Sequence, residues 1–416
     1  MPKLALLGGE KLHQGGWPEW PMVTESDVAR VAEVARSGLW GLGGTAIDEF
    51  QRRWAEYCGA KHCVCVNCGT AALELALRSV GVGAGDEVII PAYTFIATAS
   101  AVIHVGAVPV FADIGPDSFL LDPKAVAEAL TGKTKAIIPV HIGGSPCDMD
   151  AFNALAREHG LFVIEDAAQA HGAIYKGRKV GALGHAGCFS FQSSKNLSGG
   201  EGGAVCTNDD RVGEVAWSLH NCGRTRPGAR FEEDRLGHNM RMSQFTAAIL
   251  LGGLERLEEQ SGQRAANAAY LDRRLSNIPG ITPARLAPGG ERSAYHLYML
   301  KYDAQACDGL PRDRFAGAVQ AEGIPLHGGY APLYRTLAGL RDCQPDQCPL
   351  ACQFHGREMD YSQVELPVTE QVCAQSLWLP QNVLLGTQQD MDDIAAAMLK
   401  VRENVGELKQ AAAARN

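Results

Sequence analysis

The sequence has no long hydrophobic run and no surplus of basic residues. None of its 416 positions falls in an uninterrupted apolar stretch of about 18 residues, so we expect no membrane-spanning helix. Charged residues at positions 3, 10, 11 and 19 argue against a secretory signal peptide. The formal net charge of -9 offers no basic surface for nucleic acid or an anionic membrane. We therefore expect a cytoplasmic protein that binds neither.

The sequence also lacks low-complexity segments, internal repeats and a cysteine pattern typical of disulfides. Its 13 cysteines are an odd number, and segments such as Cys63-Val-Cys65 favour reduced thiols in the interior. Hydrophobic residues make up 46% of the chain, enough for two cores at this length. We predict a large domain over residues 1–265, beginning with an extended arm, and a smaller C-terminal α+β domain over residues 266–416.

Between residues 62 and 207 short apolar runs alternate with helical patterns. This alternation predicts an α/β fold with a mostly parallel sheet covered on both faces. Asp122 followed by Pro123 is a typical helix start within this region. The seven expected strands cover residues 62–66, 87–91, 108–113, 135–141, 162–166, 187–191 and 204–207.

Further helices are expected outside this region, near residues 47–57, 315–322 and 388–401, and at two longer segments. The capping pattern from Thr24 to Asp27 begins the first helix. The helical spacing of apolar residues such as Val28 and Val31 predicts that one side of this helix faces a core. A long amphipathic helix follows Arg241 and reaches Leu275, with a break near Gly262.

One lysine stands between a strand and a glycine-rich loop. Lys195 follows the buried strand that begins at Gly187, and Gly199-Gly-Glu-Gly-Gly203 comes after it. The ends of strands are where α/β sheets bind ligands. In a partly dry pocket the pKa of a lysine falls, and the neutral amine can form a Schiff base with a carbonyl. A lone lysine of this kind is more often an ordinary surface residue.

A second strand supplies the chemical partner that favours a reactive lysine. The strand from Phe162 ends at Asp166, an acid of the kind that a pyridinium nitrogen requires if pyridoxal phosphate (PLP) is to act as an electron sink. Lys195 and Asp166 together predict PLP as the cofactor.

Other residues fit a cofactor site but have simpler explanations. Gly69 and Thr70 join a strand to a helix, where free amides and the helix dipole favour a phosphate; a tight turn has the same pattern. Ser190 could add a hydroxyl, or be a buried serine bonded to backbone. Phe95 could lie flat on an aromatic cofactor, or pack a helix on the sheet.

Several motifs in order resemble those of the PLP-dependent sugar aminotransferases of the DegT/StrS type, from about residue 24 to 260. The resemblance implies a fold type I aminotransferase. The motifs are Gly69-Thr-Ala-Ala-Leu73, Asp86 to Thr98, Glu165 to Gly172, Phe189 to Lys195 with Gly200-Glu-Gly-Gly203, and Asn239 to Gln244.

The resemblance also implies roles for individual residues. Lys195 would form the Schiff base with PLP, Asp166 would pair with the pyridine nitrogen, Phe95 would stack on the ring, and Gln169 would lie near its hydroxyl. The phosphate would be held by Gly69, Thr70 and Ser190, and by Asn239 of a neighbouring subunit.

A shared phosphate site implies a homodimer. Two departures from the family pattern lie near the phosphate: Cys68 replaces a more usual serine or asparagine, and His238 replaces an aromatic residue.

The implied reaction moves an amino group from glutamine or glutamate to a ketone on a cyclitol or sugar ring, with ping-pong kinetics. A PLP sugar dehydratase of the same fold is disfavoured, because such relatives carry histidine at the position of Lys195. A non-catalytic PLP-binding regulator is disfavoured because no DNA-binding helix-turn-helix pattern is present.

The acceptor is less constrained. The opening segment and Trp378 to Gly386 resemble the branch that aminates scyllo-inosose rings in aminocyclitol and aminoglycoside biosynthesis. Leu326 to Tyr330 and Tyr334 could match the hydroxyls of a neutral ring, although aromatic core packing explains these tyrosines equally well. Nucleotide-linked keto sugars remain the alternative, for which a basic cluster is available at Arg224, Arg226 and Arg230.

Four soft ligands, Cys343, Cys348, Cys352 and His355, crowd into thirteen residues. Their spacing matches no standard zinc finger, so we expect a thiol-rich loop and no metal at the site.

Overall fold

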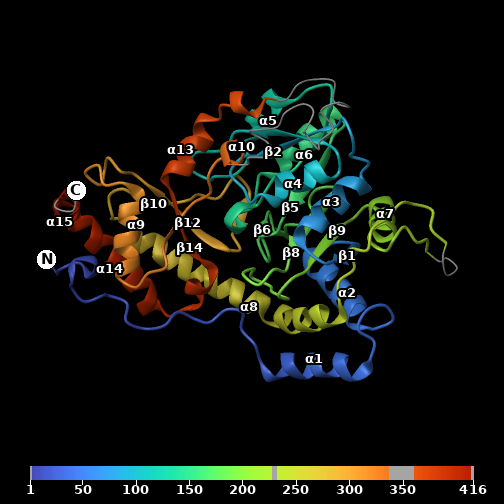
Figure 1. Ribbon diagram of the computed structural model, residues 1–416, viewed down its shortest axis with the longest axis horizontal. Helices are drawn as coiled ribbons and strands as arrows, with labels where there is room; N and C mark the ends of the chain where they lie inside the picture. Colours follow the sequence, from blue (N-terminus) through green and yellow to red (C-terminus); the bar gives the residue numbers. More distant parts are fainter. Residues whose placement is uncertain (1, 227–231, 337–359, 414–416) are drawn as a thin grey trace.

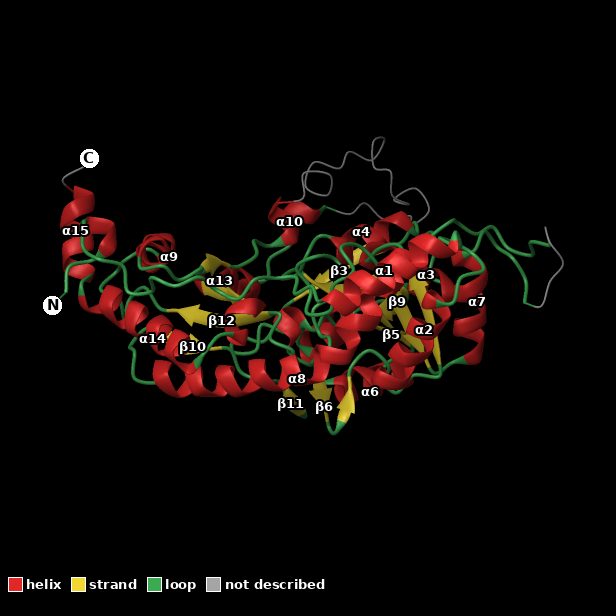
Figure 2. Cartoon of the chain, turned by 90° about the horizontal axis from the view of Figure 1, so that it is seen from below, coloured by secondary structure: helices red, strands yellow, loops and turns green. Residues whose placement is uncertain are grey.

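The computed structural model describes residues 2–226, 232–336 and 360–413 (Figure 1). The predicted cluster of Cys343, Cys348, Cys352 and His355 lies outside these residues, as does Arg230. Figure 2 shows an elongated molecule with the large sheet toward one end and a smaller sheet toward the other. Within the described part of the chain, no helix combines the length and apolar composition needed to cross a bilayer.

The large sheet has seven strands, as predicted, in the order β1-β9-β8-β5-β4-β2-β3. Strand β9 is antiparallel to both of its neighbours, and the other neighbouring strands are parallel. The strands are β1 (His62–Val66), β2 (Glu87–Pro91), β3 (Val108–Ala112), β4 (Thr134–Ile137), β5 (Phe162–Asp166), β8 (Ala186–Ser190) and β9 (Gly203–Thr207).

Strand β4 ends at Ile137, four residues before the predicted end. Ile138 still donates its N–H to the Ile89 carbonyl at 2.9 Å, but Pro139 has no N–H with which to continue the ladder. The remaining strand bounds agree with the sequence to within one residue.

Helices connect the strands and pack on the sheet. Asp122 accepts from the Lys124 N–H and Pro123 opens its helix, as predicted, while Asp148 caps the next helix by accepting from Ala151. These helices are α2 (Ala46–Cys58), α3 (Gly69–Ser79), α4 (Ala97–His104), α5 (Pro123–Ala129), α6 (Met149–His159) and α7 (Asp210–His220).

Helix α1 (Glu25–Ser37) begins at the predicted capping box of Thr24 and Asp27. The prediction that its apolar side faces a core is wrong within this chain, because Val28 is 51% exposed and Asp27 is the buried residue. Asp27 pairs with Arg256 of the neighbouring helix at 2.9 Å. Figure 1 shows α1 at the outer edge of the molecule, alongside α8, and none of the residues that the structure describes covers its outer side.

Helix α8 (Gln244–Leu275) is continuous, and the predicted break near Gly262 is wrong. A glycine in a helix interior costs about 1 kcal/mol relative to alanine. Buried neighbours offset this cost: Arg264 donates to the Gln381 side chain at 2.9 Å, and Asn267 donates to the Leu384 carbonyl at 2.9 Å. The expected domain boundary between residues 265 and 266 therefore falls inside a helix.

The C-terminal half contributes an antiparallel sheet in the order β10-β12-β14-β13. Its strands are β10 (Ile281–Pro283), β12 (Leu297–Tyr302), β13 (His327–Gly328) and β14 (Ser376–Pro380). A third sheet joins β11 (Gly290–Arg292), β6 (Ile174–Tyr175) and β7 (Arg178–Lys179). The described part of this half contains the helices α9 (Arg312–Ala321), α10 (Leu333–Thr336), α13 (Pro367–Gln375), α14 (Gln388–Glu403) and α15 (Val405–Ala413).

Two hydrophobic cores accompany these sheets. The larger surrounds the seven-stranded sheet and includes Leu333 and Tyr361 from the C-terminal half. The smaller lies around β12, α9 and α14 and includes Leu4. Short 3-10 helices complete the fold at Ala5–Leu7, Ile142–Gly144, Tyr361–Gln363 and Gln381–Leu385.

The first residues form an arm on the body, as predicted, but Ala5–Leu7 is a 3-10 helix where an extended chain was expected. The Trp17 indole donates to the Gly323 carbonyl at 3.0 Å, and the Asn382 side chain donates to the Pro18 carbonyl at 2.8 Å. The Trp20 indole donates to the carbonyl of Lys195 at 3.1 Å. The arm thus runs from the small sheet to the segment that carries the predicted reactive lysine.

Candidate active site

A cavity of about 590 Å³ lies at the carboxyl ends of β5 and β8. Seven of the predicted site residues line it together: Gly69, Thr70, Phe95, Asp166, Gln169, Ser190 and Lys195. These residues come from four separate strand ends and the segments that follow them. The fold therefore brings the predicted constellation into one place, where an α/β sheet binds its ligands.

Lys195 sits on the loop that leaves β8. Its N–H donates to the Gln192 carbonyl at 2.9 Å, and its own carbonyl accepts from Trp20. Burial lowers the pKa of the Lys195 amine to about 8, and the nearby carboxylate of Asp166 opposes this shift. The lowered pKa increases the fraction of Lys195 that is a neutral amine near neutral pH, the form that a nucleophile or a proton carrier requires.

Asp166 ends β5 as a buried acid. One carboxylate oxygen accepts from the Thr98 hydroxyl at 2.8 Å, and the other accepts from the Ala168 N–H at 3.2 Å. Burial raises the pKa of Asp166, while the Thr98 and Ala168 hydrogen bonds work in the opposite direction. The two bonds fix the carboxylate in the cavity and favour its ionised form.

The start of α3 approaches the end of β8 closely. A Cβ on Gly69 would lie 2.7 Å from the Cβ of Ser190, and one on Gly203 would lie 2.4 Å from the Cys68 carbonyl oxygen. Only glycine fits at these two positions. Cys68 itself caps the helix, because its Sγ accepts from the Ala71 N–H at 3.4 Å. The departure at Cys68 therefore preserves the helix start, where Gly69 and Thr70 line the cavity.

Gln169 is held on both sides of its amide. Its Oε1 accepts from the Gly143 N–H at 2.6 Å, and its Nε2 donates to the Tyr330 hydroxyl at 3.1 Å. Phe95 behaves differently, since 56% of it is exposed and its ring borders the cavity. An exposed aromatic face at a cavity wall is open to stack on a flat ring.

Asn239 does not line the cavity of its own chain. It is exposed and pairs as an isolated bridge with Asn221. Figure 1 shows the chain between α7 and α8 projecting from the body. The expectation that Asn239 reaches a neighbouring subunit stays a prediction.

The structure places Thr98, which the sequence did not indicate, beside Asp166. It places Tyr334, which the sequence did indicate, outside the cavity lining. Thr98, which fixes Asp166, lies four residues after Thr94 in the same motif as Phe95. Tyr334, a candidate for the acceptor pocket, is buried in the core and donates to Glu370 at 2.9 Å, away from the cavity lining.

Other newly placed residues come from distant segments. His296, Leu297 and Trp378 line the cavity beside Tyr330, and all four belong to the C-terminal half. Tyr330 is a predicted acceptor residue and Trp378 begins a segment noted in the sequence, whereas no motif marks His296 or Leu297. The packing of the small sheet against the large one brings all four to the cavity.

Comparisons with known proteins agree with this geometry. Two curated relatives are L-glutamine:2-deoxy-scyllo-inosose aminotransferases. The one from Streptoalloteichus tenebrarius is 38% identical and covers 98% of this chain and 99% of its own. The one from Streptomyces fradiae is 40% identical, and the match covers 97% of this chain and 99% of the relative. The solved structure of S. venezuelae DesV in complex with a ketimine intermediate is 35% identical, covers 91% of this chain and 94% of its own, and has a TM-score of 0.78.

The family model of the DegT/DnrJ/EryC1/StrS aminotransferases matches residues 21–399, nearly the whole chain. The match includes every residue that lines the cavity. The chain therefore belongs to the DegT/DnrJ/EryC1/StrS aminotransferase family.

Proposed function

We propose that this aminotransferase uses PLP to convert the ketone of a cyclitol related to scyllo-inosose into an amine, with L-glutamine as donor. The observation that carries the proposal is the pair of Lys195 and Asp166, which line one cavity at two neighbouring strand ends. The acceptor and donor follow from the names of the curated relatives, which match this chain over almost its full length.

The residues of the cavity fit PLP. Its phosphate would lie at the start of α3, between Gly69, Thr70 and Ser190, where backbone crowding leaves space only for glycine. Its ring would lie against the exposed face of Phe95, with the nitrogen toward Asp166 and the hydroxyl toward Gln169. Its aldehyde carbon would then face Lys195. When bound, PLP supplies an electron sink for the carbanion that deprotonation of the donor creates.

The protein's own residues provide proton transfer and orientation. Lys195 Nζ, with its lowered pKa, takes the proton from the α-carbon of the donor and later delivers one to the carbon that carried the ketone. Asp166, fixed by Thr98, keeps an anion beside the cofactor nitrogen and favours its protonated form. Gln169 cannot rotate its amide, because Gly143 and Tyr330 occupy both ends.

The charge of the cavity favours a neutral ring over a nucleotide-linked sugar. Among the described residues that line it, Lys195 is the only lysine or arginine. A nucleotide diphosphate would require further cations. Of the predicted basic cluster, the Arg226 guanidinium stacks 3.9 Å from the centre of the Trp217 ring, and neither Arg224 nor Arg226 lines the cavity of its own chain.

A homodimer is part of this proposal. Exposed apolar side chains gather on the arm, on α1 and on the loop that follows, with Val23 71% exposed and Trp40 56% exposed. A monomer rarely leaves such a surface uncovered, and a second copy is the commonest partner. The surface comprises Met22, Val23, Val28, Leu39, Trp40 and Leu42.

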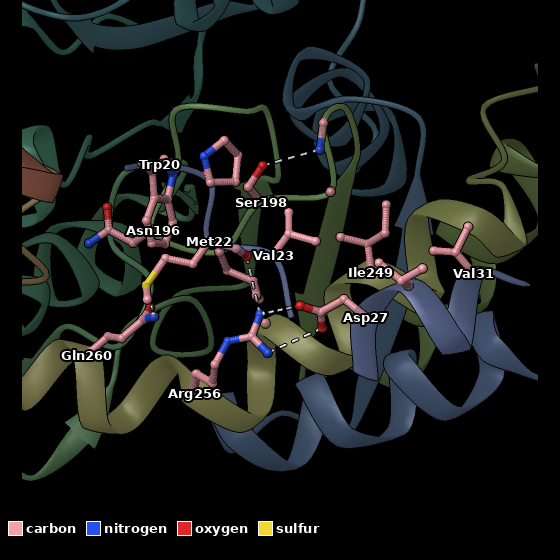
Figure 3. A pocket seen from close by; sticks show the side chains of 16 residues that line it. Trp20, Met22, Val23, Asp27, Val31, Asn196, Ser198, Ile249, Arg256 and Gln260 are labelled. Carbon is pink, nitrogen blue, oxygen red and sulfur yellow. Dashed lines mark hydrogen bonds and ion pairs between the residues drawn. The ribbon is translucent and has the colours of Figure 1, made fainter. Parts of the chain in front are cut away.

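This surface borders a second, mostly apolar pocket of about 330 Å³, shown in Figure 3. Trp20, Met22 and Val23 of the arm form one wall, and Ile249 of α8 lies across from them. Residues 196–200, directly after Lys195, form another wall. A second subunit on this surface would therefore lie against the active-site loop, as the shared role of Asn239 requires.

Competition between two acceptors tests the function. Purified PLP-loaded protein, with glutamine as donor, should aminate scyllo-inosose with a much larger kcat/KM than a nucleotide-linked 4-keto-6-deoxyhexose. Amination of the nucleotide sugar alone would overturn the cyclitol proposal. The Lys195→Ala variant should lose the visible absorption of bound PLP and all turnover, and full activity in that variant would overturn the proposed site.

A further inference from the structure

His296 occupies a constrained position at the edge of the active-site cavity. It directly precedes β12, is 7% exposed and lines the same cavity as Lys195. The residue before it, Tyr295, has φ of 51°, in the left-handed region that non-glycine residues seldom adopt. Such backbone strain persists only where surrounding contacts enforce it, and it is concentrated at functional sites.

Hydrogen bonds from neighbouring segments hold this backbone. The Tyr295 N–H donates to the Ser293 hydroxyl at 3.0 Å, and the Ala294 N–H donates to the Gly144 carbonyl at 2.9 Å. The Ala294 carbonyl accepts from the side chain of Asn196 at 2.7 Å. Asn196 follows Lys195 directly, so the position of His296 is tied to the loop that carries the reactive amine.

The same asparagine determines the protonation of the imidazole. Since Asn196 Nδ2 donates to a backbone carbonyl, its Oδ1 is the atom that faces His296 Nδ1, at 3.2 Å. A carbonyl oxygen only accepts, so Nδ1 carries the proton. Burial, together with the positive charges of Lys195 and Arg264, holds the pKa of His296 well below its usual range. The ring is therefore neutral, and Nε2 is left as a hydrogen-bond acceptor.

Nε2 has no hydrogen-bond partner among the described residues, although only 7% of His296 is exposed. Nε2 is not fully buried, so it remains accessible. The space that His296 borders is the active-site cavity. A buried acceptor without a partner costs free energy unless a ligand supplies a donor.

We propose that His296 Nε2 accepts a hydrogen bond from a ring hydroxyl of the keto acceptor and thereby selects polyhydroxylated ketones. The carboxylate of the amino donor does not fit this atom, because an unprotonated nitrogen has no hydrogen to offer it. A hydroxyl does fit, and sites that hydrogen-bond a substrate hydroxyl discriminate strongly against ketones without one. This inference depends on the proposed function in one respect, namely that the acceptor ketone carries hydroxyl groups.

Two single-residue variants separate this role from a structural one. The amide of His296→Asn can still reach Asn196 but is too short to present an acceptor at the position of Nε2. The side chain of His296→Gln is one methylene longer and restores an acceptor there. Both are compared with wild type in the PLP-loaded enzyme by thermal unfolding, by the glutamine half-reaction followed spectroscopically, and by kcat/KM for the acceptor.

We expect H296N to keep the glutamine half-reaction within about threefold of wild type and to lose about 10- to 100-fold in kcat/KM for the hydroxylated ketone. H296Q should recover most of that loss. An equal loss in both half-reactions, an unchanged acceptor kcat/KM in H296N, or no recovery in H296Q would overturn the proposal. Each variant is assayed with the hydroxylated ketone that the wild type aminates faster. The wild-type enzyme alone tests the cyclitol proposal, and the variants test the role of His296.

Discussion

The indole Nε1 of Trp20 lies 3.1 Å from the backbone carbonyl oxygen of Lys195 and donates a hydrogen bond to it. The N-terminal arm thus reaches the loop that carries the proposed reactive amine of Lys195. Because an amine must stay close to two different carbons during proton transfer, small losses in its positioning reduce the rate.

We therefore predict that Trp20→Phe slows the glutamine half-reaction by about 3- to 10-fold, which corresponds to the loss of one neutral hydrogen bond. Trp17→Phe is the matched control, since its indole donates to Gly323, in the C-terminal half, at a similar distance. Stopped-flow absorbance measures both. Equal rates in the two variants would contradict a specific role for Trp20.

Thr98 is predicted to set the ionisation of Asp166. Its hydroxyl donates to the carboxylate at 2.8 Å and opposes the increase in pKa that burial causes. Thr98→Val removes the hydroxyl with little change of volume, so the pKa of Asp166 should rise further. Because the proposed mechanism requires the ionised carboxylate, activity should be lost at a higher pH than in wild type as the solution is acidified.

The pH profile of kcat/KM measures this shift, and Thr98→Ser should restore the wild-type profile. Asp166→Asn, which cannot ionise at all, should fold but be slower by more than about 100-fold at every pH, a barrier increase near 3 kcal/mol. A Thr98→Val profile that coincides with wild type would show that other groups fix the carboxylate.

Lys195 should reduce the stability of the cofactor-free protein at neutral pH. Its pKa falls from 10.5 to about 8 on folding, so between these values the unfolded chain binds more protons than the folded one. Stability therefore rises with pH across this interval, and the full penalty is present below about pH 8. The difference of 2.5 pKa units sets an upper limit of about 3 kcal/mol.

Cofactor-free Lys195→Met should accordingly be more stable than cofactor-free wild type at pH 7, with a difference that shrinks between pH 8 and 10.5. Urea denaturation at several pH values measures it. Lys124→Met, at an exposed position, is the control and should show no such difference. A gap that does not depend on pH would contradict the explanation by proton linkage.

The exposed apolar surface should mediate subunit association. Trp40→Glu places a charge where 56% of an indole is exposed, and it should shift sedimentation from dimer toward monomer with a parallel loss of activity. Leu399→Glu is the control, because this leucine is 40% exposed on α14, outside the surface. A Trp40→Glu enzyme that remains a fully active dimer would place the interface elsewhere.

Much of the fold and of the cofactor side of the cavity was predictable from the sequence, because local physical chemistry determines them. Buried strands read as short apolar runs, Asp122 and Thr24 cap their helices by local hydrogen bonds, and Lys195 and Asp166 each follow from their place at the end of a strand. The carboxyl ends of parallel strands lie at the same edge of a sheet. Lys195 and Asp166 could therefore be predicted to lie at one site although they are separated in the sequence.

Only the tertiary structure decided the features that depend on packing between distant segments. His296, Tyr330 and Trp378 reach the cavity because the small sheet packs beside the large one, and no local pattern encodes that contact. Helical periodicity alone could not show that Val28 is uncovered within its own subunit or that helix α8 continues through Gly262. Periodicity reports which residues share a face, whereas the neighbours of that face are set by the rest of the chain or by a second subunit.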